Sequence, residues 1–278
     1  MRGSMSGSRS RLAGWRWSLV LVVGMVLAIG ALPVPLARGQ AFQPQPPAEL
    51  PPAATRSVCR PPEPAVQKTP GISLRIDRGP AECNAVSLTF DAGADRGYTE
   101  MILDTLRDEQ VHVTFGMTGL WAQKNGDLVK RMVDEGHELI NHTWSHSSFT
   151  GFSAGRPLGV GERRLELDRT EDLLLELTGR TTRPYFRPPY GDLDPGALKD
   201  VADAGYDYTI MWTVDSLGWN HLSKQAIIDR CLSRAEPGAI FIFHVGEQSL
   251  DGPALGAIIA GLREQGYTMV TVTDLLGL

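Results

Sequence analysis

The chain has 278 residues and a formal net charge of −5, and 42% of its residues are hydrophobic. Residues 1–39 hold five arginines and no acid, so the rest of the chain has 22 basic residues against 32 acidic ones, a net charge of −10. This acidic balance argues against nucleic acid as a partner.

The first 39 residues are typical of a signal peptide or an uncleaved signal anchor. Arginines near the start precede an apolar run over residues 17–36, which contains Pro33 and Pro35. A single transmembrane helix is the alternative, since the run is nearly long enough to span a bilayer, but the prolines and the small residues after them favour cleavage. We therefore expect an exported protein that is extracellular, periplasmic or associated with the cell envelope, with membrane attachment only through this segment.

Residues 40–70 are rich in proline, and residues 71–278 follow as one domain's worth of chain. Proline-rich segments are stiff and extended, and this one has too few apolar residues to offset the entropy of ordering. It is predicted to be an unstructured tether in front of a domain that is large enough to form a sizeable core.

The chain has three cysteines, an odd number for an exported protein. A disulfide between Cys59 and Cys83 could join the tether to the domain, with Cys231 left over. Three unpaired thiols are the alternative, and the spacing does not decide between them.

Short β-branched or apolar runs alternate with amphipathic stretches through the domain. The predicted strands cover residues 85–90, 111–116, 138–141, 185–187, 206–212, 239–243 and 267–271. About seven such alternations predict an α/β fold with a parallel sheet covered by helices, either closed into a barrel or open and doubly wound. Residues 72–77 look like an added strand before this repeat.

Several polar residues fall just after predicted strands. They are Asp91, His142, His146, Arg187, Asp215 and His244. A parallel barrel places its active site at this end of its strands. A random scatter of histidines would not follow successive strands in this way, so we expect the functional site there.

His142 and His146 have a spacing that lets both imidazoles bind one divalent ion. A carboxylate such as Asp91 would take a proton from water bound to that ion. The pair alone is a weak signal, because paired histidines also occur on ordinary polar surfaces. With the carboxylate and the distant His244, it indicates a hydrolase.

Five short motifs resemble, in this order, those of the polysaccharide deacetylases of the NodB-homology type, carbohydrate esterase family four. They are Thr89-Phe90-Asp91-Ala92-Gly93, His142-Thr143-Trp144-Ser145-His146, Arg187-Pro188-Pro189-Tyr190-Gly191, Val214-Asp215-Ser216-Leu217-Gly218-Trp219 and Ile242-Phe243-His244. The resemblance implies a distorted (β/α) barrel that removes N-acetyl groups from an amino-sugar polymer or oligomer. It also implies a divalent metal ion, commonly zinc.

Roles for the catalytic residues follow from the same resemblance. Asp91 would be the general base that takes a proton from the attacking water. His142 and His146 would be the metal ligands, and His244 the general acid that protonates the leaving amine. Structural roles are the alternative, such as a helix cap at Asp91 or a core histidine at His244.

The resemblance assigns supporting roles to four further positions. Arg187 and Asp215 would form an ion pair that orients the catalytic groups, although a purely structural pair is the alternative. The backbone N–H of Tyr190 would help to hold the oxyanion. Tyr190, Pro189 and Trp219 would contact the glycan substrate, with a place in the core or at the rim as the alternative for the aromatic rings.

Two positions depart from the family pattern. Ala92 stands where the family has the carboxylate that completes its His-His-Asp metal site, so two imidazoles and water would form a weaker site of open metal identity. Asp95 on the same loop is a candidate substitute ligand, and Asn141 is another. Gly218 replaces the second acid of the D-x-x-D-W segment, which loosens the expected network near Trp219.

Three functions fit these residues. The first is an exported de-N-acetylase that acts on peptidoglycan, a chitin-like oligomer or an exopolysaccharide. The second is a glycan-binding pseudoenzyme that lost its metal through Ala92, and the third is a hydrolase of cyclic amides or other non-peptide C–N bonds. Asp91 and His244 favour an enzyme, because a binding module needs neither an acid nor a base, and the export signal and tether favour a polymer.

Overall fold

The computed structural model describes residues 69–82 and 84–278. The predicted signal segment, nearly all of the predicted tether, Cys59 and Cys83 lie outside these residues, so export, the tether and the Cys59–Cys83 disulfide stay predictions. Cys231 is unpaired and buried, and burial raises the pKa of its thiol to about 12.

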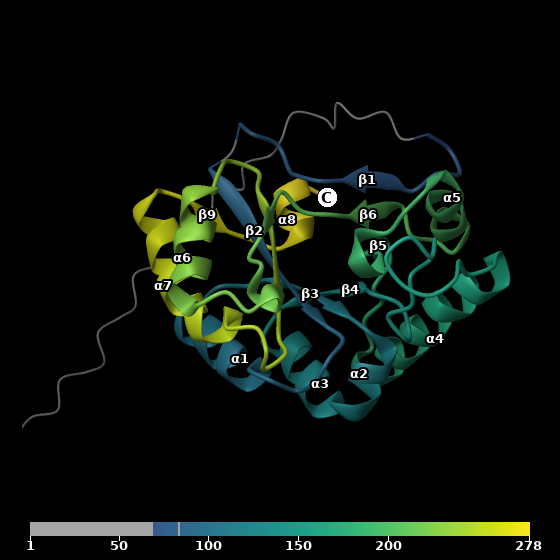
Figure 1. Ribbon diagram of the computed structural model, residues 1–278, viewed down its shortest axis with the longest axis horizontal. Helices are drawn as coiled ribbons and strands as arrows, with labels where there is room; N and C mark the ends of the chain where they lie inside the picture. The colour runs from purple at the N-terminus through teal and green to yellow at the C-terminus, as the bar shows by residue number, and fades with distance from the viewer. Residues whose placement is uncertain (1–68, 83) are drawn as a thin grey trace, which may run out of the picture. The chain divides into compact units, whose positions relative to one another are not determined.

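Nine strands form one sheet in the described part of the chain (Figure 1). They are β1 (Leu74–Ile76), β2 (Ala85–Ala92), β3 (Thr114–Met117), β4 (Glu138–Asn141), β5 (Tyr185–Phe186), β6 (Tyr208–Ile210), β7 (Val214–Asp215), β8 (Ile240–His244) and β9 (Thr268–Met269). Their order is β1-β6-β5-β4-β3-β2-β8-β7, with β9 on β2, and every pairing is parallel. Because β1 and β7 are the outer strands of this order, the curled sheet is an open half-barrel.

The predicted α/β fold with a distorted parallel barrel is confirmed. The added strand expected over residues 72–77 is β1, which pairs with β6 at one edge of the sheet. The sequence prediction missed β7 at the other edge. This strand has two residues, which is too short to show the two-residue period of a strand.

Eight α-helices and two 3₁₀ turns connect the described strands. They are α1 (Thr99–Asp108), α2 (Gly119–Lys124), α3 (Gly126–Asp134), α4 (Val160–Thr178), η1 (Pro189–Gly191), α5 (Pro195–Asp203), η2 (Gly218–Asn220), α6 (Lys224–Ser233), α7 (Asp251–Glu264) and α8 (Val272–Leu276). Figure 1 shows α6 and α7 packed side by side, and α1, α2 and α3 grouped along the bottom of the view, below β3. None of the helices in the described ranges is both long and apolar enough to cross a membrane.

Successive side chains of β2 point to opposite faces of the sheet, one towards the apolar core and the other towards the functional site. Leu88 and Phe90 belong to the main apolar core, where the ring centroid of Phe90 lies 5.1 Å from that of Phe243. Thr89 and Asp91 both accept hydrogen bonds from Arg187 instead. One strand therefore stabilises the core with one set of residues and carries the polar site with the other.

His137, just before β4, is a buried histidine away from the polar site. Its Nδ1 accepts a hydrogen bond from the Val113 N–H at 3.3 Å, and its Nε2 has no hydrogen-bond partner among the described residues. Burial, together with His112 and Arg131, lowers its pKa to about 4. The unfolded chain takes up this proton near pH 6.5, so the free energy of unfolding should fall as the pH drops from about 6.5 to about 4.

We expect His137→Asn to remove this acid sensitivity, because an asparagine oxygen still accepts from Val113 but carries no titratable group. The loss of unfolding free energy between pH 7.5 and pH 4 should be smaller than in the parent protein by on the order of 3 kcal/mol. Urea unfolding at several pH values measures it. His221→Asn at the exposed end of η2 is the control, since asparagine tolerates the φ of 58° at that position. Equal pH dependence in both variants would contradict the prediction.

Candidate active site

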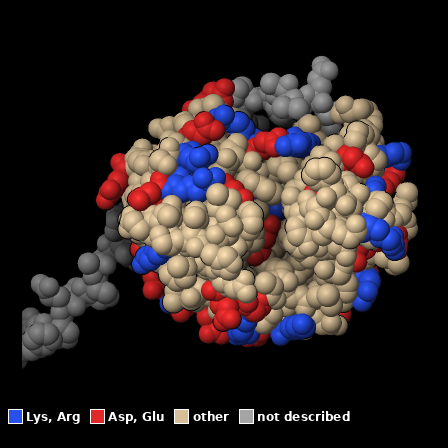
Figure 2. Space-filling model, in the orientation of Figure 1, with Lys and Arg blue, Asp and Glu red and all other residues tan. Residues whose placement is uncertain are grey.

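A cavity of about 630 Å³ opens at the carboxyl ends of the strands. Its lining includes most of the residues that the sequence singled out, namely Asp91, Asp95, His142, His146, Tyr190, Asp215, Trp219 and His244. Pro189 is buried in the fold and does not line the cavity, whereas its neighbour Pro188 does, so the predicted glycan contact of Pro189 is not supported. Figure 2 shows that the face drawn in Figure 1 is hollowed near its middle, with charged side chains of both signs mainly around its edge.

Asp91 lies near the end of β2, between two neighbouring strands. In the sheet register it pairs with Gly116 on β3 and with His244 on β8. The candidate base and the candidate acid therefore stand on adjacent strands. Gly116 leaves room for the carboxylate, because a Cβ at this position would lie 2.3 Å from Asp91 Oδ1.

The guanidinium of Arg187 is fully buried behind the cavity. Its Nη1 donates to Asp91 Oδ1 at 2.9 Å and to Thr89 Oγ1 at 2.8 Å, and its Nε donates to the Ile210 carbonyl at 3.1 Å. The expectation that Arg187 pairs with Asp215 is therefore wrong. Arg187 follows β5 and reaches across to β2, whereas Asp215 ends the outer strand β7.

Asp215 instead organises the loop that carries Trp219. One carboxylate oxygen accepts the Leu217 N–H at 2.8 Å, and both oxygens lie 3.3 Å from the indole N–H of Trp219. The Trp219 side chain stays half-exposed at the rim of the cavity. Asp215 is thus placed to orient an aromatic surface rather than the catalytic groups.

The electrostatic surroundings of Asp91 keep it ionised. Burial alone would raise its pKa, but His142, the guanidinium of Arg187 and His244 together outweigh this effect and hold the pKa below its ordinary value. The other carboxylate oxygen, Oδ2, lies 3.4 Å from His142 Nε2. A buried carboxylate that is ionised at neutral pH has the protonation state of a general base.

The two histidines of the predicted metal site lie side by side, with ring centroids 4.8 Å apart. Nδ1 of His142 lies 2.8 Å from the carbonyl oxygen of Arg187, which can only accept, so Nδ1 carries the proton and Nε2 keeps its lone pair. Burial lowers the pKa of His142, and burial with the neighbouring His142 ring lowers that of His146 to about 3. Both rings are therefore neutral at working pH, which is the form that binds metal ions.

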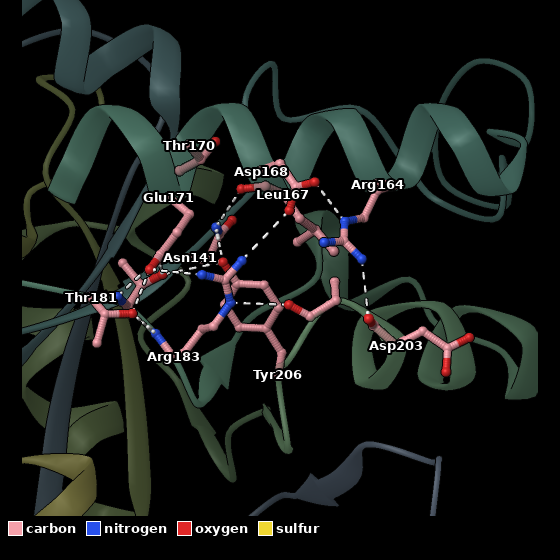
Figure 3. Close-up of polar contacts among 12 residues, drawn as sticks. Asn141, Arg164, Leu167, Asp168, Thr170, Glu171, Thr181, Arg183, Asp203 and Tyr206 are labelled. Carbon is pink, nitrogen blue, oxygen red and sulfur yellow. Dashed lines mark hydrogen bonds and ion pairs between the residues drawn. The ribbon is translucent and has the colours of Figure 1, made fainter. Parts of the chain in front are cut away.

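Asn141, suggested by the sequence as a second oxygen ligand, has its side chain occupied elsewhere (Figure 3). Its Nδ2 donates to Tyr206 Oη at 2.7 Å and to the Leu167 carbonyl at 3.0 Å. Its Oδ1 accepts the Thr143 N–H at 2.9 Å. These bonds give Asn141 a structural role, in which it fixes the start of the histidine loop against α4, and they do not support it as a metal ligand.

Position 92 supplies no third ligand for the metal site. Ala92 is fully buried among apolar side chains, and Asp95 lines the cavity with Oδ1 accepting the Glu247 N–H at 2.9 Å. Within residues 69–82 and 84–278, no group of three or more His, Cys, Asp or Glu side chains is arranged to hold a metal ion. Two neutral imidazoles fit part of a tetrahedral shell, with water or substrate at the other positions. Metal binding by Asp95 stays a prediction.

Several residues of the cavity were not found from the sequence. They are Ser153, Trp212, Gln248 and Ser249, together with Pro188. Gln248 and Ser249 follow β8 by only a few residues, so their place near the strand end was the available signal. Their residue types carry no specific chemistry, which is why the pattern did not single them out.

Gly116 offers a test of the packing around Asp91. We expect Gly116→Ala to lower the unfolding free energy by about 1–3 kcal/mol, because the added methyl group must displace a buried, paired carboxylate. Gly161→Ala on α4 is the control, since a Cβ there meets nothing within 4 Å and alanine favours the helix. Denaturant unfolding compares the two, and a Gly116→Ala variant as stable as the parent would contradict the geometry.

Comparisons with known proteins match both the sequence and the fold. The family model for polysaccharide deacetylases matches residues 78–209. The peptidoglycan-N-acetylmuramic acid deacetylase PdaA of Bacillus subtilis is 34% identical over 194 residues, which are 69% of this chain and 71% of PdaA. The solved structure of PdaA, a family 4 carbohydrate esterase, matches with a TM-score of 0.66 and 32% identity over 73% of this chain and 84% of that one.

Two further relatives differ in activity. A peptidoglycan-N-acetylglucosamine deacetylase of Bacillus cereus is 32% identical over 200 residues, 71% of this chain and 70% of that protein. The structure of a CE4 family pseudoenzyme from Bacillus anthracis matches with a TM-score of 0.67 and 29% identity, over 76% of this chain and 70% of that one. Since relatives above 30% identity cover more than two thirds of this chain and share its half-barrel, the chain belongs to the polysaccharide deacetylase family, carbohydrate esterase family four of the NodB-homology type.

Proposed function

We propose that this protein hydrolyses N-acetyl groups on the amino sugars of peptidoglycan. The observation that carries the proposal is the pairing of Asp91 with His244 on adjacent strands, in one cavity with His142 and His146. Hydrolysis of an acetamide requires a base for the attacking water and an acid for the leaving amine. This cavity offers one candidate for each role.

Asp91 would take the proton from the water that attacks the acetyl carbonyl. Its lowered pKa keeps it ionised, and Arg187 holds one carboxylate oxygen at 2.9 Å while the other faces His142. The held oxygen fixes the orientation of the carboxylate, so little reorganisation is needed when the proton moves.

His244 would protonate the nitrogen that leaves from the tetrahedral intermediate, because an amine is a poor leaving group unless it is protonated. Its ring lines the cavity, and 31% of its side chain is exposed. The negative charge on the intermediate needs a donor. The backbone N–H of Tyr190, at a φ of 59°, has no acceptor among the described residues and is a candidate for that role.

His142 and His146 would hold a divalent metal ion, with zinc as the expected ion. When bound, the ion would lower the pKa of water and polarise the acetamide oxygen. Asp95 is the available spare carboxylate of the cavity loop. We expect Asp95→Ala to weaken zinc affinity by about 10-fold, measured by competition with a chelator, while Asp134→Ala on the exposed side of α3 leaves it unchanged. Equal affinity in both variants would remove Asp95 from the site.

The substrate class is supported by the relatives. One is a peptidoglycan-N-acetylmuramic acid deacetylase and another a peptidoglycan-N-acetylglucosamine deacetylase, so either sugar is a candidate here. The half-exposed rings of Tyr190 and Trp219 offer stacking surfaces for a sugar at the rim of the cavity. Mass spectrometry of digested peptidoglycan after treatment with the protein tests this proposal. Loss of acetyl groups from one of the two sugars identifies the substrate, and unchanged fragments would contradict the proposal.

A second candidate function is glycan binding without turnover. Ala92 lacks a ligand atom, and one structural relative is a pseudoenzyme. If this function is correct, the protein binds acetylated chito-oligosaccharide or peptidoglycan and releases no acetate with any offered divalent metal. Acetylated glycan offered beside a cyclic ureide also separates deacetylation from hydrolysis of other C–N bonds.

We also propose that the protein works outside the cytoplasm, on the strength of the signal-like segment and the proline-rich segment that precede the domain. Peptidoglycan is reached from that side. Fractionation of cells and N-terminal sequencing of the exported form test this, and a protein found only in the cytoplasm would contradict it.

A further inference from the structure

Asp251, the first residue of α7, is a fully buried carboxylate beside the candidate acid. Its Oδ2 accepts the backbone N–H of His244 at 2.8 Å and the hydroxyl of Ser216 at 3.1 Å. Its Oδ1 has no hydrogen-bond partner among the described residues. A buried carboxylate needs donors or a counter-charge close to it.

The imidazole of His244 offers a donor close to this carboxylate. Its Nδ1 is buried and without a partner in the described part of the chain, and it lies 3.9 Å from Asp251 Oδ2. This separation is too long for a hydrogen bond. Catalytic hydrogen bonds are often long without substrate and shorten in the complex.

Gly218 is the reason that this carboxylate fits. A Cβ at position 218 would lie 2.4 Å from Asp251 Oδ1 and 2.2 Å from Ser249 Oγ. The place where the family pattern has an acidic side chain on the loop after β7 is thus taken by a carboxylate that comes from α7. The structure places no such group there from Asp215, whose oxygens bind the Leu217 N–H and the indole of Trp219.

We propose that Asp251 is the positioning residue for His244, and this inference rests on the proposed function. Its carboxylate accepts the Nδ1–H of His244 and thereby keeps Nε2 directed at the cavity. The negative charge stabilises the imidazolium until Nε2 gives its proton to the leaving amine, after which the ring is neutral. Burial raises the pKa of Asp251, and the backbone N–H and imidazole of His244 partly offset this effect. In the proposed step the carboxylate takes no proton, as is general for a carboxylate behind a catalytic imidazole.

The charges around the ring agree with this role. His244 is faced by Asp91 from β2, by His142 and His146 across the cavity and by Asp251 from α7. Two of these groups are acids, but Asp91 is already neutralised by Arg187. Asp251 has no arginine or lysine partner among the described ion pairs, so the imidazolium is its available counter-charge.

The test is Asp251→Asn, which keeps an oxygen for the backbone N–H of His244 and removes the charge. With the full-length protein we expect kcat for acetate release to fall by about 10-fold or more, with KM changed less than about 2-fold. We also expect the basic limb of the pH–rate profile to move down by about one pH unit, because an imidazolium without its carboxylate loses its proton more easily.

Ser216→Ala is the matched control, since it removes another hydrogen bond to the same carboxylate oxygen and keeps the charge. It should leave the basic limb in place. Asp251→Glu moves the charge by one methylene, so it should lower kcat but retain the pH limb. If Asp251→Asn fails to fold, Asp251→Glu still measures the effect of this contact on kcat.

A second measurement separates this inference from the proposed function. Titration of the His244 imidazole by NMR in metal-free protein needs no turnover, and its pKa should fall by about one unit in Asp251→Asn. If acetate is never released but this shift occurs, the proposed function fails and the positioning contact stands. If acetate is released and neither the imidazole pKa nor the pH limb moves in Asp251→Asn, the inference is overturned.

Discussion

Replacing Asp91 with asparagine is expected to lower kcat for acetate release by about 100-fold or more. Asparagine keeps the size of the side chain but cannot take a proton from water. His142 and His146 remain in place, so the variant should still bind zinc. Steady-state rates of acetate release and the zinc content of the purified variant are the two measurements.

Loss of activity in this variant must be separated from loss of folding, because Arg187 is left as a buried charge without its partner. The rate is therefore normalised to the folded fraction, obtained from a urea unfolding curve. Asp134→Asn on the exposed side of α3 is the matched change and should keep the parent rate. An Asp91→Asn variant that is folded and retains most of the activity would exclude Asp91 as the base.

The second large effect is expected at Arg187. Arg187→Met should lower the unfolding free energy by about 3–5 kcal/mol, because it leaves the Asp91 carboxylate buried and unpaired and removes donors from three other acceptors. Arg187→Lys should recover only part of this, since a lysine cannot donate in three directions from a planar group. Urea unfolding at neutral pH measures both.

The exposed pair of Arg75 with Asp77 provides the control for Arg187. Arg75 Nη2 lies 2.6 Å from Asp77 Oδ1, but both side chains are about half-exposed. Arg75→Met should therefore lower the unfolding free energy by less than about 1 kcal/mol. The double variant Asp91→Asn with Arg187→Met should lose less unfolding free energy than the two single variants lose together. A loss below about 1 kcal/mol in Arg187→Met would contradict the buried ion pair.

The gathering of Asp91, His142, His146 and His244 could be predicted from the sequence. Each follows or ends a strand, and the carboxyl ends of parallel strands meet at one end of a barrel whatever its exact curl. The motifs fixed which residue types to look for, and the strand pattern fixed where they lie.

The partners of these residues could not be predicted in the same way. Arg187 contacts Asp91 rather than Asp215 because the curl of the sheet brings the end of β5 towards β2, and no local pattern encodes that distance. The place of Asp251 beside His244 depends on the length of the loop between β8 and α7. Pro188 and Pro189 are adjacent, and only the backbone path decides which of them lines the cavity.

The central claim is that the cavity performs metal-assisted deacetylation although alanine stands at position 92. The most direct test measures zinc content and acetate release together, on acetylated chito-oligosaccharide and on peptidoglycan, before chelation, after chelation and with zinc restored. We expect acetate release that disappears with the zinc and returns with it. A protein that binds the glycan but releases no acetate with zinc or any other offered divalent metal would contradict the claim and assign the chain to the binding function.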